Sequence, residues 1–92
     1  MDTYEVSLAV TFQPPLSIAR EQQAMDCLEA LGPRALEVTS TDCAVTLAID
    51  GDDSESARNE AEFTVARALA TAGHTMHTAP IRTSSVRPAA PA

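Results

Sequence analysis

The residues from Tyr4 to Phe12 alternate between two kinds of side chain with a period of two. The even positions carry large apolar residues, and the odd positions between them are polar or small: Tyr4, Val6, Leu8, Val10 and Phe12 against Glu5, Ser7, Ala9 and Thr11. In an extended strand this alternation places all the apolar side chains on one face, whereas a helix would spread them around its circumference. The pattern therefore predicts a strand with one buried and one open face.

A helical pattern begins after this strand, at Leu16 or Ser17, and runs to Leu31. Apolar residues recur there at the i, i+3, i+4 and i+7 positions of a helix: Ala24, Cys27, Leu28 and Leu31. Gly32-Pro33 ends the pattern, because glycine takes the left-handed conformation after a last turn and proline cannot continue a helix.

A second helix is predicted to open within residues 52–55, to continue to about Ala72 and to end at Gly73. Asp52 and Glu55 form one possible capping pair at its start. Its inner face is mostly small, so that we expect it to approach the sheet closely: Ala57, Ala61, Val65, Ala68, Leu69 and Ala72. Phe63 lies roughly opposite this face, either packed against the first helix or exposed as a single apolar residue.

Three further strands are predicted from alternating patterns: 34–40, 43–49 and, more weakly, 74–79. The first two are joined by a short connection at Thr41-Asp42 that suits a hairpin. In the third of these strands, the sequence does not decide whether Met76 or His77 faces the core. Pro80 follows it, which suits a strand at the edge of the sheet. Residues 83–92 are almost entirely Ser, Thr, Pro, Ala and Arg, which predicts a disordered tail.

The resulting order is strand, helix, strand, strand, helix, strand. With right-handed crossovers, two helices of this length cover one face of a four-stranded antiparallel sheet. The order resembles the ferredoxin-like split βαβ (βαββαβ) sandwich, an α+β fold in which the first and third strands are central. We therefore expect a ferredoxin-like domain over residues 1–82 and a disordered tail over 83–92. The resemblance concerns the fold alone, which many unrelated functions share.

The charge and composition of the chain limit the classes of partner that it is expected to bind. The 92 residues include 13 acidic and six basic side chains, a net charge of -7, and only three aromatic residues. Such a surface repels nucleic acid and anionic membranes, and the core is expected to be thin and aliphatic. We see no signal peptide or apolar run of membrane-spanning length, and the two cysteines stand alone, so the expected location is cytoplasmic.

Three groups of residues are candidates for a chemical site. The acidic run 50–55 does not match a calcium loop, because its sixth and twelfth positions hold Glu55 and Ala61, and it fits a helix start better. His74 and His77 do not complete a metal site, and three residues apart on a strand they point to opposite faces. The two cysteines, Cys27 and Cys43, are expected to be buried thiols. We therefore predict no catalytic, cofactor-binding or metal-binding residues, although a chemical role for these histidines and cysteines stays open.

The open face of the central strands is small and weakly polar, which favours contact with another surface. We predict an interface there, formed by Ser7, Ala9, Thr11, Ala44, Thr46 and Ala48. The expected function is a non-enzymatic interaction or regulatory module, acting as a homodimer or with a protein partner. The alternative is a small dimeric α/β-barrel-type enzyme or an apolar-ligand-binding domain, for which this face offers at best His77, Glu5 and Glu37.

Overall fold

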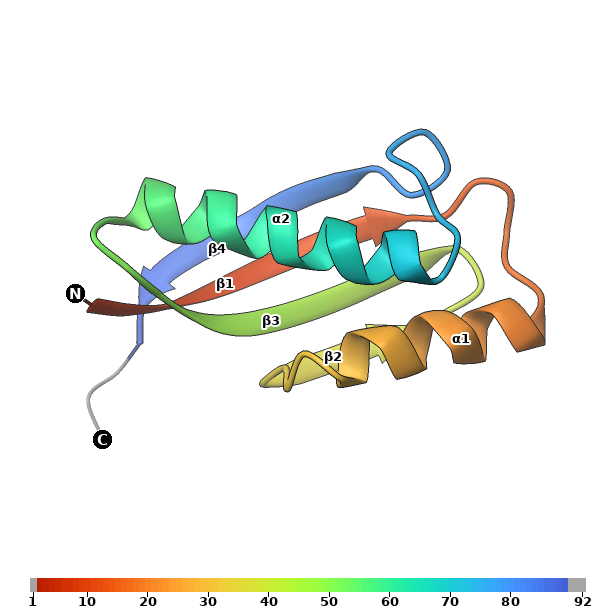
Figure 1. Cartoon of the computed structure of the whole chain (residues 1–92), viewed down its shortest axis with the longest axis horizontal. Coiled ribbons are helices and arrows are strands. Elements are labelled where there is room, and N and C mark those ends of the chain that lie inside the picture. Colours follow the sequence, from red (N-terminus) through yellow and green to blue (C-terminus); the bar gives the residue numbers. More distant parts are fainter. Residues whose placement is uncertain (1, 90–92) are drawn as a thin grey trace.

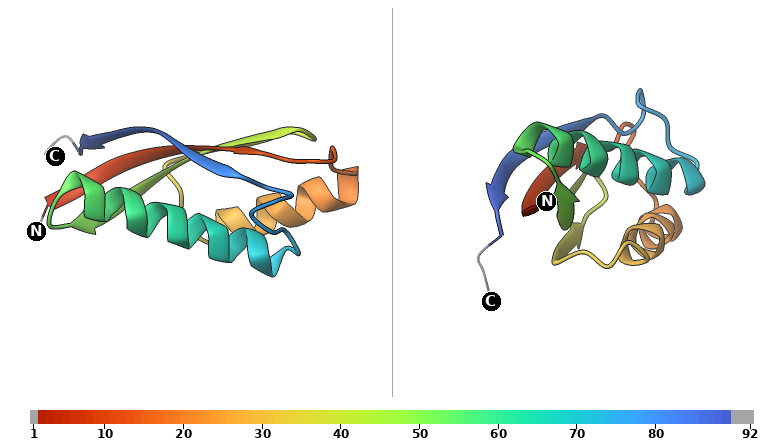
Figure 2. Two further views of the ribbon diagram at one scale, coloured as in Figure 1. Left: turned by 90° about the horizontal axis from the view of Figure 1, so that it is seen from above. Right: turned by 60° about the vertical axis from the view of Figure 1, so that its left-hand side comes forward.

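The computed structural model describes residues 2–89. Its elements are β1 (Asp2–Thr11), α1 (Ile18–Glu29), β2 (Ala35–Val38), β3 (Asp42–Gly51), α2 (Ser54–Thr71) and β4 (Ile81–Pro88). The four strands form one antiparallel sheet in the order β2-β3-β1-β4, and both helices pack on the same side of it (Figures 1 and 2). The fold is therefore α+β with a four-stranded open sheet, as predicted, and the first and third strands are central.

Strand β1 is the centre of the molecule. It pairs with β3 along its whole length, from Asp2 opposite Gly51 to Thr11 opposite Asp42, and with β4 on its other side. Val6, Leu8 and Val10 are at most 1% exposed, while the residues between them are only partly buried. The predicted alternation is confirmed, since it places the apolar set of β1 in the core beneath the helices.

Each helix begins at a side-chain cap. The Ser17 hydroxyl accepts a hydrogen bond from the Arg20 backbone N–H at the start of α1. At α2 the cap is Asp53, whose Oδ1 accepts from the Ser56 N–H at 2.8 Å, so the pair of Asp52 and Glu55, named as one possibility, is not the cap. Asp53 takes this role because its extended backbone directs the carboxylate back over the first turn.

The inner face of α2 is formed mainly by alanines. All six residues predicted for this face are buried: Ala57, Ala61, Val65, Ala68, Leu69 and Ala72. Gly73, with φ of +88°, follows the helix and takes a conformation that other residues rarely adopt. In the part of the chain described here, no helix is both long and apolar enough to span a membrane.

The fourth strand is β4, Ile81–Pro88, and the prediction of a strand over 74–79 is wrong. That segment is a turn held by local hydrogen bonds of two threonines. The Thr75 N–H donates to the Thr78 hydroxyl at 2.9 Å, and the Thr78 N–H donates to the Thr75 carbonyl at 3.2 Å. These local bonds fold the segment into a turn rather than an extended strand, and the Thr78 carbonyl also accepts from the Gln13 N–H at 2.9 Å.

The prediction of a disordered tail is wrong for residues 83–88, which belong to β4. Val86 lies opposite Val6 and Thr83 opposite Leu8, so that Ser84 is one extra residue between them, a β-bulge. The Ser84 hydroxyl donates to the Ser7 carbonyl at 3.0 Å. The domain therefore extends past the predicted end at residue 82, while residues 90–92 of the predicted tail lie outside the described residues.

Candidate functional site

The candidate site is the open face, by which we mean the side of the sheet opposite the two helices. Strand pairing aligns its outward side chains in three rows across the strands. The first row is Glu37, Ala44, Ala9 and Arg82; the second is Ala35, Thr46, Ser7 and Ser85; the third is Ala48, Glu5 and Arg87. All four strands contribute to this surface.

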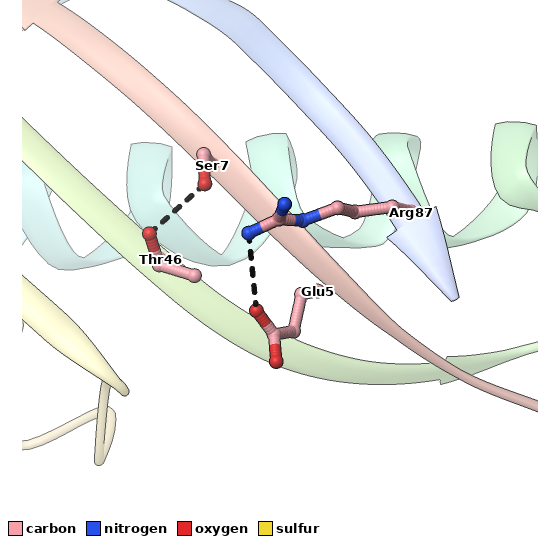
Figure 3. A network of polar contacts seen from close by, with 4 residues as sticks. All are labelled: Glu5, Ser7, Thr46 and Arg87. Atoms are coloured by element: carbon pink, nitrogen blue, oxygen red, sulfur yellow. Dashed lines mark hydrogen bonds and ion pairs between the residues drawn. The ribbon is translucent and has the colours of Figure 1, made fainter. Parts of the chain in front are cut away.

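The centre of the open face is neutral and small-sided. The hydroxyls of Ser7 and Thr46 lie 2.9 Å apart and hydrogen-bond to each other across β1 and β3 (Figure 3). Ala9 and Ala44 lie directly opposite each other in the next row. Because the two hydroxyls partner each other and the alanines lack polar atoms, this centre can be covered at little desolvation cost.

The six residues predicted for an interface all lie on this face, on the two central strands. Ser7, Ala9, Ala44, Thr46 and Ala48 form a continuous patch, while Thr11 is exposed at the end of β1 opposite Asp42. Their part in an interface stays a prediction.

Charged side chains stand at the rim of the open face. On β4, Arg87 Nη2 lies 3.8 Å from Glu5 Oε1 and forms an ion pair with it (Figure 3). Arg82, on the same strand, and Glu37, on the opposite edge strand β2, are both exposed. Neither of these two makes an ion pair with any residue between 2 and 89. One edge of the face is thus basic and the other acidic.

Sequence reasoning missed the contribution of β4 to this face. Arg82, Ser85 and Arg87 point outward, but the bulge at Ser84 shifts the phase, so that no single period of two connects them. The apolar residues Ile81 and Val86, five apart, were the available sign of this strand. His77 was named as a residue that this face could offer at best, but it lies exposed in the turn between α2 and β4.

His74 is buried in the connection between α2 and β4. It is 7% exposed, and its ring lies against Phe12, with 5.3 Å between the ring centroids. Its Nε2 has no hydrogen-bond partner among the described residues. Burial, and secondly the nearby Arg20 guanidinium, hold the pKa of His74 below its usual value, so that the ring is neutral at pH 7.

The two cysteines are free thiols in different surroundings. Cys43 is 3% exposed in the core, and burial raises its pKa to about 11. Cys27 is half-buried and lines the groove between α1 and α2. Cys43 confirms the prediction of a buried thiol, whereas Cys27 is more accessible than expected.

The later part of the acidic run 50–55 caps and begins α2, as predicted, while Asp50 and Gly51 end β3. The backbone N–H and hydroxyl of Ser56 hydrogen-bond to Asp53 and lower the pKa of its carboxyl. Within residues 2–89 no three His, Cys, Asp or Glu side chains are grouped so that they could hold a metal ion.

A hollow lies on the helix side of the sheet, between α2, the 74–79 turn and β4. It has a volume of about 280 Å³, and its walls are mainly apolar. Phe63 and Met76, at 59% and 61% exposed, lie at this hollow. The Arg67 guanidinium stands 5.7 Å from the Phe63 ring centre, so that Phe63 is an exposed residue covered in part by a cation–π contact.

Comparison with known proteins gave no match. No family model fits the chain, and neither a curated protein nor a solved structure is significantly similar to it.

Proposed function

We propose that the chain is a non-enzymatic interaction module that binds a protein partner through the open face. The observation that carries this proposal is the arrangement of that face, with a neutral, small-sided centre and charges at the rim. Protein interfaces have the same organisation, since their centres are depleted of charged residues and their rims are polar. Alanine, serine and threonine also lose little side-chain entropy when they are covered.

The proposal includes the ferredoxin-like topology. It is supported by the βαββαβ order, by the sheet order β2-β3-β1-β4 and by two helices on one face. In such an arrangement one sheet face is left for contacts with other molecules. The topology does not select a partner, because unrelated functions share this fold.

Capture of a partner from an extract of the source cells tests the proposal. Ala48→Arg places a long charged side chain on the open face while leaving the core intact. Asn59→Arg is the matched control, because it adds the same charge at an exposed position on α2. We expect the wild type and Asn59→Arg to retain the same identified protein, and Ala48→Arg to lose it.

Circular dichroism must show that both variants are folded, and the interaction is then measured with the purified partner. Equal binding by Ala48→Arg and Asn59→Arg would show that the open face is not the binding surface.

An apolar-ligand-binding domain is the second candidate, and it is favoured by the apolar hollow beside α2. Its volume of about 280 Å³ suits a small apolar molecule. Ala66→Trp would fill the hollow, because Ala66 lines it. A fluorescent probe of apolar sites such as anilinonaphthalene sulfonate should then bind the wild type and not the variant; equal binding to both contradicts this candidate.

A further inference from the structure

One cross-strand row of the open face carries opposite charges at its two ends. Strand pairing places Glu37 opposite Ala44, Ala44 opposite Ala9, and Ala9 opposite Arg82. The row therefore reads acid, alanine, alanine, base from β2 to β4. Glu37 and Arg82 are both exposed. Within residues 2–89 the ion pair joins Glu5 and Arg87, so neither Glu37 nor Arg82 has an ion-pair partner there.

This row is complementary to itself under one kind of two-fold symmetry. When two open faces stack about an axis parallel to the strands, the axis exchanges the two edges of the sheet and keeps the height along the strands. β4 of one copy then lies over β2 of the other, at the level of the same row. A two-fold axis perpendicular to the strands and running along this row would instead place Arg82 over Arg82 and Glu37 over Glu37, which is repulsive.

We propose that the partner of the open face is a second copy of this chain, stacked about an axis parallel to the strands. Arg82 of each copy then pairs with Glu37 of the other, at both edges of the interface. The proposal rests on the proposed function, because it uses the same face, and it adds the identity and orientation of the partner.

The dimensions of the sheet fit this arrangement. Neighbouring strands lie about 4.8 Å apart, so β2 and β4 are about 14 Å apart across the sheet, and stacked sheets lie about 10 Å apart. Extended arginine and glutamate side chains together span that separation, while the alanines between them let the sheets come close. The four strands hold 10, 4, 10 and 8 residues, so at about 3.3 Å by 4.8 Å per residue they present roughly 500 Å² per copy, which is below the ~800 Å² of a standard interface and suits a weak, reversible dimer.

The neutral centre and the charged edges of the open face contribute differently to the proposed dimer. The neutral centre around Ser7, Ala9, Ala44 and Thr46 supplies the covered area. The two edge ion pairs stay partly solvated, so they add little affinity by themselves. Their main effect is on orientation, because the competing arrangement brings like charges together.

Charge reversal tests the pairing. In Glu37→Arg both edges place arginine over arginine, and in Arg82→Glu both place glutamate over glutamate. We expect each variant alone to dimerise at least about tenfold more weakly than the wild type. An equimolar mixture of the two restores both contacts in a heterodimer, and the double variant E37R/R82E restores them in a homodimer. Light scattering coupled to size exclusion, and sedimentation equilibrium, measure all five samples.

Both substituted positions are exposed, and circular dichroism checks that the variants are folded. If charge reversal unfolds either chain, Glu37→Thr and Arg82→Thr replace it, because threonine suits a strand. Each should then weaken the dimer by less than charge reversal would, since it removes an attraction without adding a repulsion; a dimer as tight as the wild type in both variants overturns the pairing.

The outcomes separate this inference from the proposed function. A wild type that is monomeric at about a hundred micromolar overturns the second copy as partner, while capture of another protein that Ala48→Arg abolishes leaves the proposed function standing. Under this axis Ala48 lies over Glu5 of the other copy, so Thr46→Arg, in the uncharged second row, is the variant that tests the face here. A dimer that Thr46→Arg leaves intact uses another surface and also overturns the inference. A dimer that Thr46→Arg breaks, but that the mixture and the double variant do not restore, overturns the Arg82–Glu37 pairing.

Discussion

At the scale of single residues, His74 is a polar side chain buried in the core, where its ring nitrogen loses its hydrogen bond to water. It is the one buried polar side chain among residues 2–89, and its Nε2 has no partner there. A neutral imidazole can remain in this position, but a proton on it would be buried beside the Phe12 ring and near the Arg20 guanidinium. The folded state therefore disfavours the charged form of His74.

The stability of the chain should consequently depend on pH through His74. The unfolded chain binds a proton at the ordinary pKa of about 6.5, whereas the folded chain binds it only at lower pH. The contribution of the neutral ring is therefore fully present above pH 6.5, and it is lost as the pH falls toward the folded pKa. Urea unfolding from about pH 7.5 to pH 5 measures this loss.

His74→Phe is the control, because it replaces the imidazole with a ring that does not titrate. We expect the difference in unfolding free energy between this variant and the wild type to grow as the pH falls. The carboxylates titrate in both proteins and drop out of that difference. A difference that stays constant with pH would show that His74 does not titrate differently on folding.

The two cysteines should differ in their reaction with iodoacetamide. Cys27 is half-buried at the groove between the helices, whereas Cys43 is 3% exposed with a pKa raised to about 11. Since the thiolate is the reactive form, one thiol per chain should react in the native protein and the second only in denaturant. Mass spectrometry of the labelled chain locates the adduct. Cys43→Ala should leave the native rate unchanged, and Cys27→Ala should remove it; native labelling at Cys43 would contradict the burial described above.

At the scale of elements, β4 is required to cover one side of β1. Its residues pair with β1 from Tyr4 opposite Pro88 to Val10 opposite Ile81. Deletion of residues 84–92 would remove the half of β4 beyond the bulge and expose Val6, which is fully buried. We expect a loss of more than about 2 kcal/mol in unfolding free energy, because ladder bonds and apolar cover are lost together.

The matched control ends the chain after residue 89 and keeps all of β4. Chemical denaturation of the two shortened chains compares them directly. If both unfold at the same denaturant concentration, β4 beyond the bulge does not stabilise the domain.

The two faces of β1 should respond differently to substitution. Leu8→Ala removes a side chain that is 1% exposed and should cost about 2–5 kcal/mol. Ser7→Ala removes the hydroxyl partner of Thr46 on the open face, where water can replace it, and should cost less than about 1 kcal/mol. Denaturant unfolding of both variants decides the matter; similar losses would contradict the burial pattern of β1.

The difference between β1 and β4 explains how far the sequence predicts this fold. Unbroken alternation identified β1 and β3, and regular apolar spacing identified both helices, because one period describes the whole of each element. β4 is polar at most positions and changes phase at Ser84, so it resembled a tail. The 74–79 segment alternates without being a strand, because Thr75 and Thr78 bond to each other.

The part of the open face that lies on β1 and β3 could be predicted from the sequence, but its alignment with β2 and β4 could not. The alanines and hydroxyls of β1 and β3 follow directly from the alternation of these strands. The alignment of Glu37 with Arg82 depends on the register of three strand pairs and on the position of the bulge. No local pattern contains that information, because it arises only when distant segments pair.

At the scale of the whole molecule, the net charge of -7 opposes the association of two copies. This repulsion acts over the whole surface, whereas the proposed Arg82–Glu37 contacts act only at short range. The Debye length falls from about 30 Å at 0.01 M salt to about 8 Å at 0.15 M salt. Added salt in this range therefore screens the repulsion between the copies more than it weakens contacts at the interface.

The dimer should accordingly become tighter, not weaker, as salt rises from about 0.01 M to 0.15 M. Sedimentation equilibrium of the wild type at both salt concentrations measures this change. Asn59→Arg lowers the net negative charge at a position away from the open face, so it should dimerise more tightly than the wild type at low salt and equally at the higher concentration. If salt instead weakens the wild-type dimer throughout, ion pairs rather than the neutral centre dominate its affinity. In that case Arg82→Glu would abolish the dimer in both salts, while the low-salt advantage of Asn59→Arg would disappear.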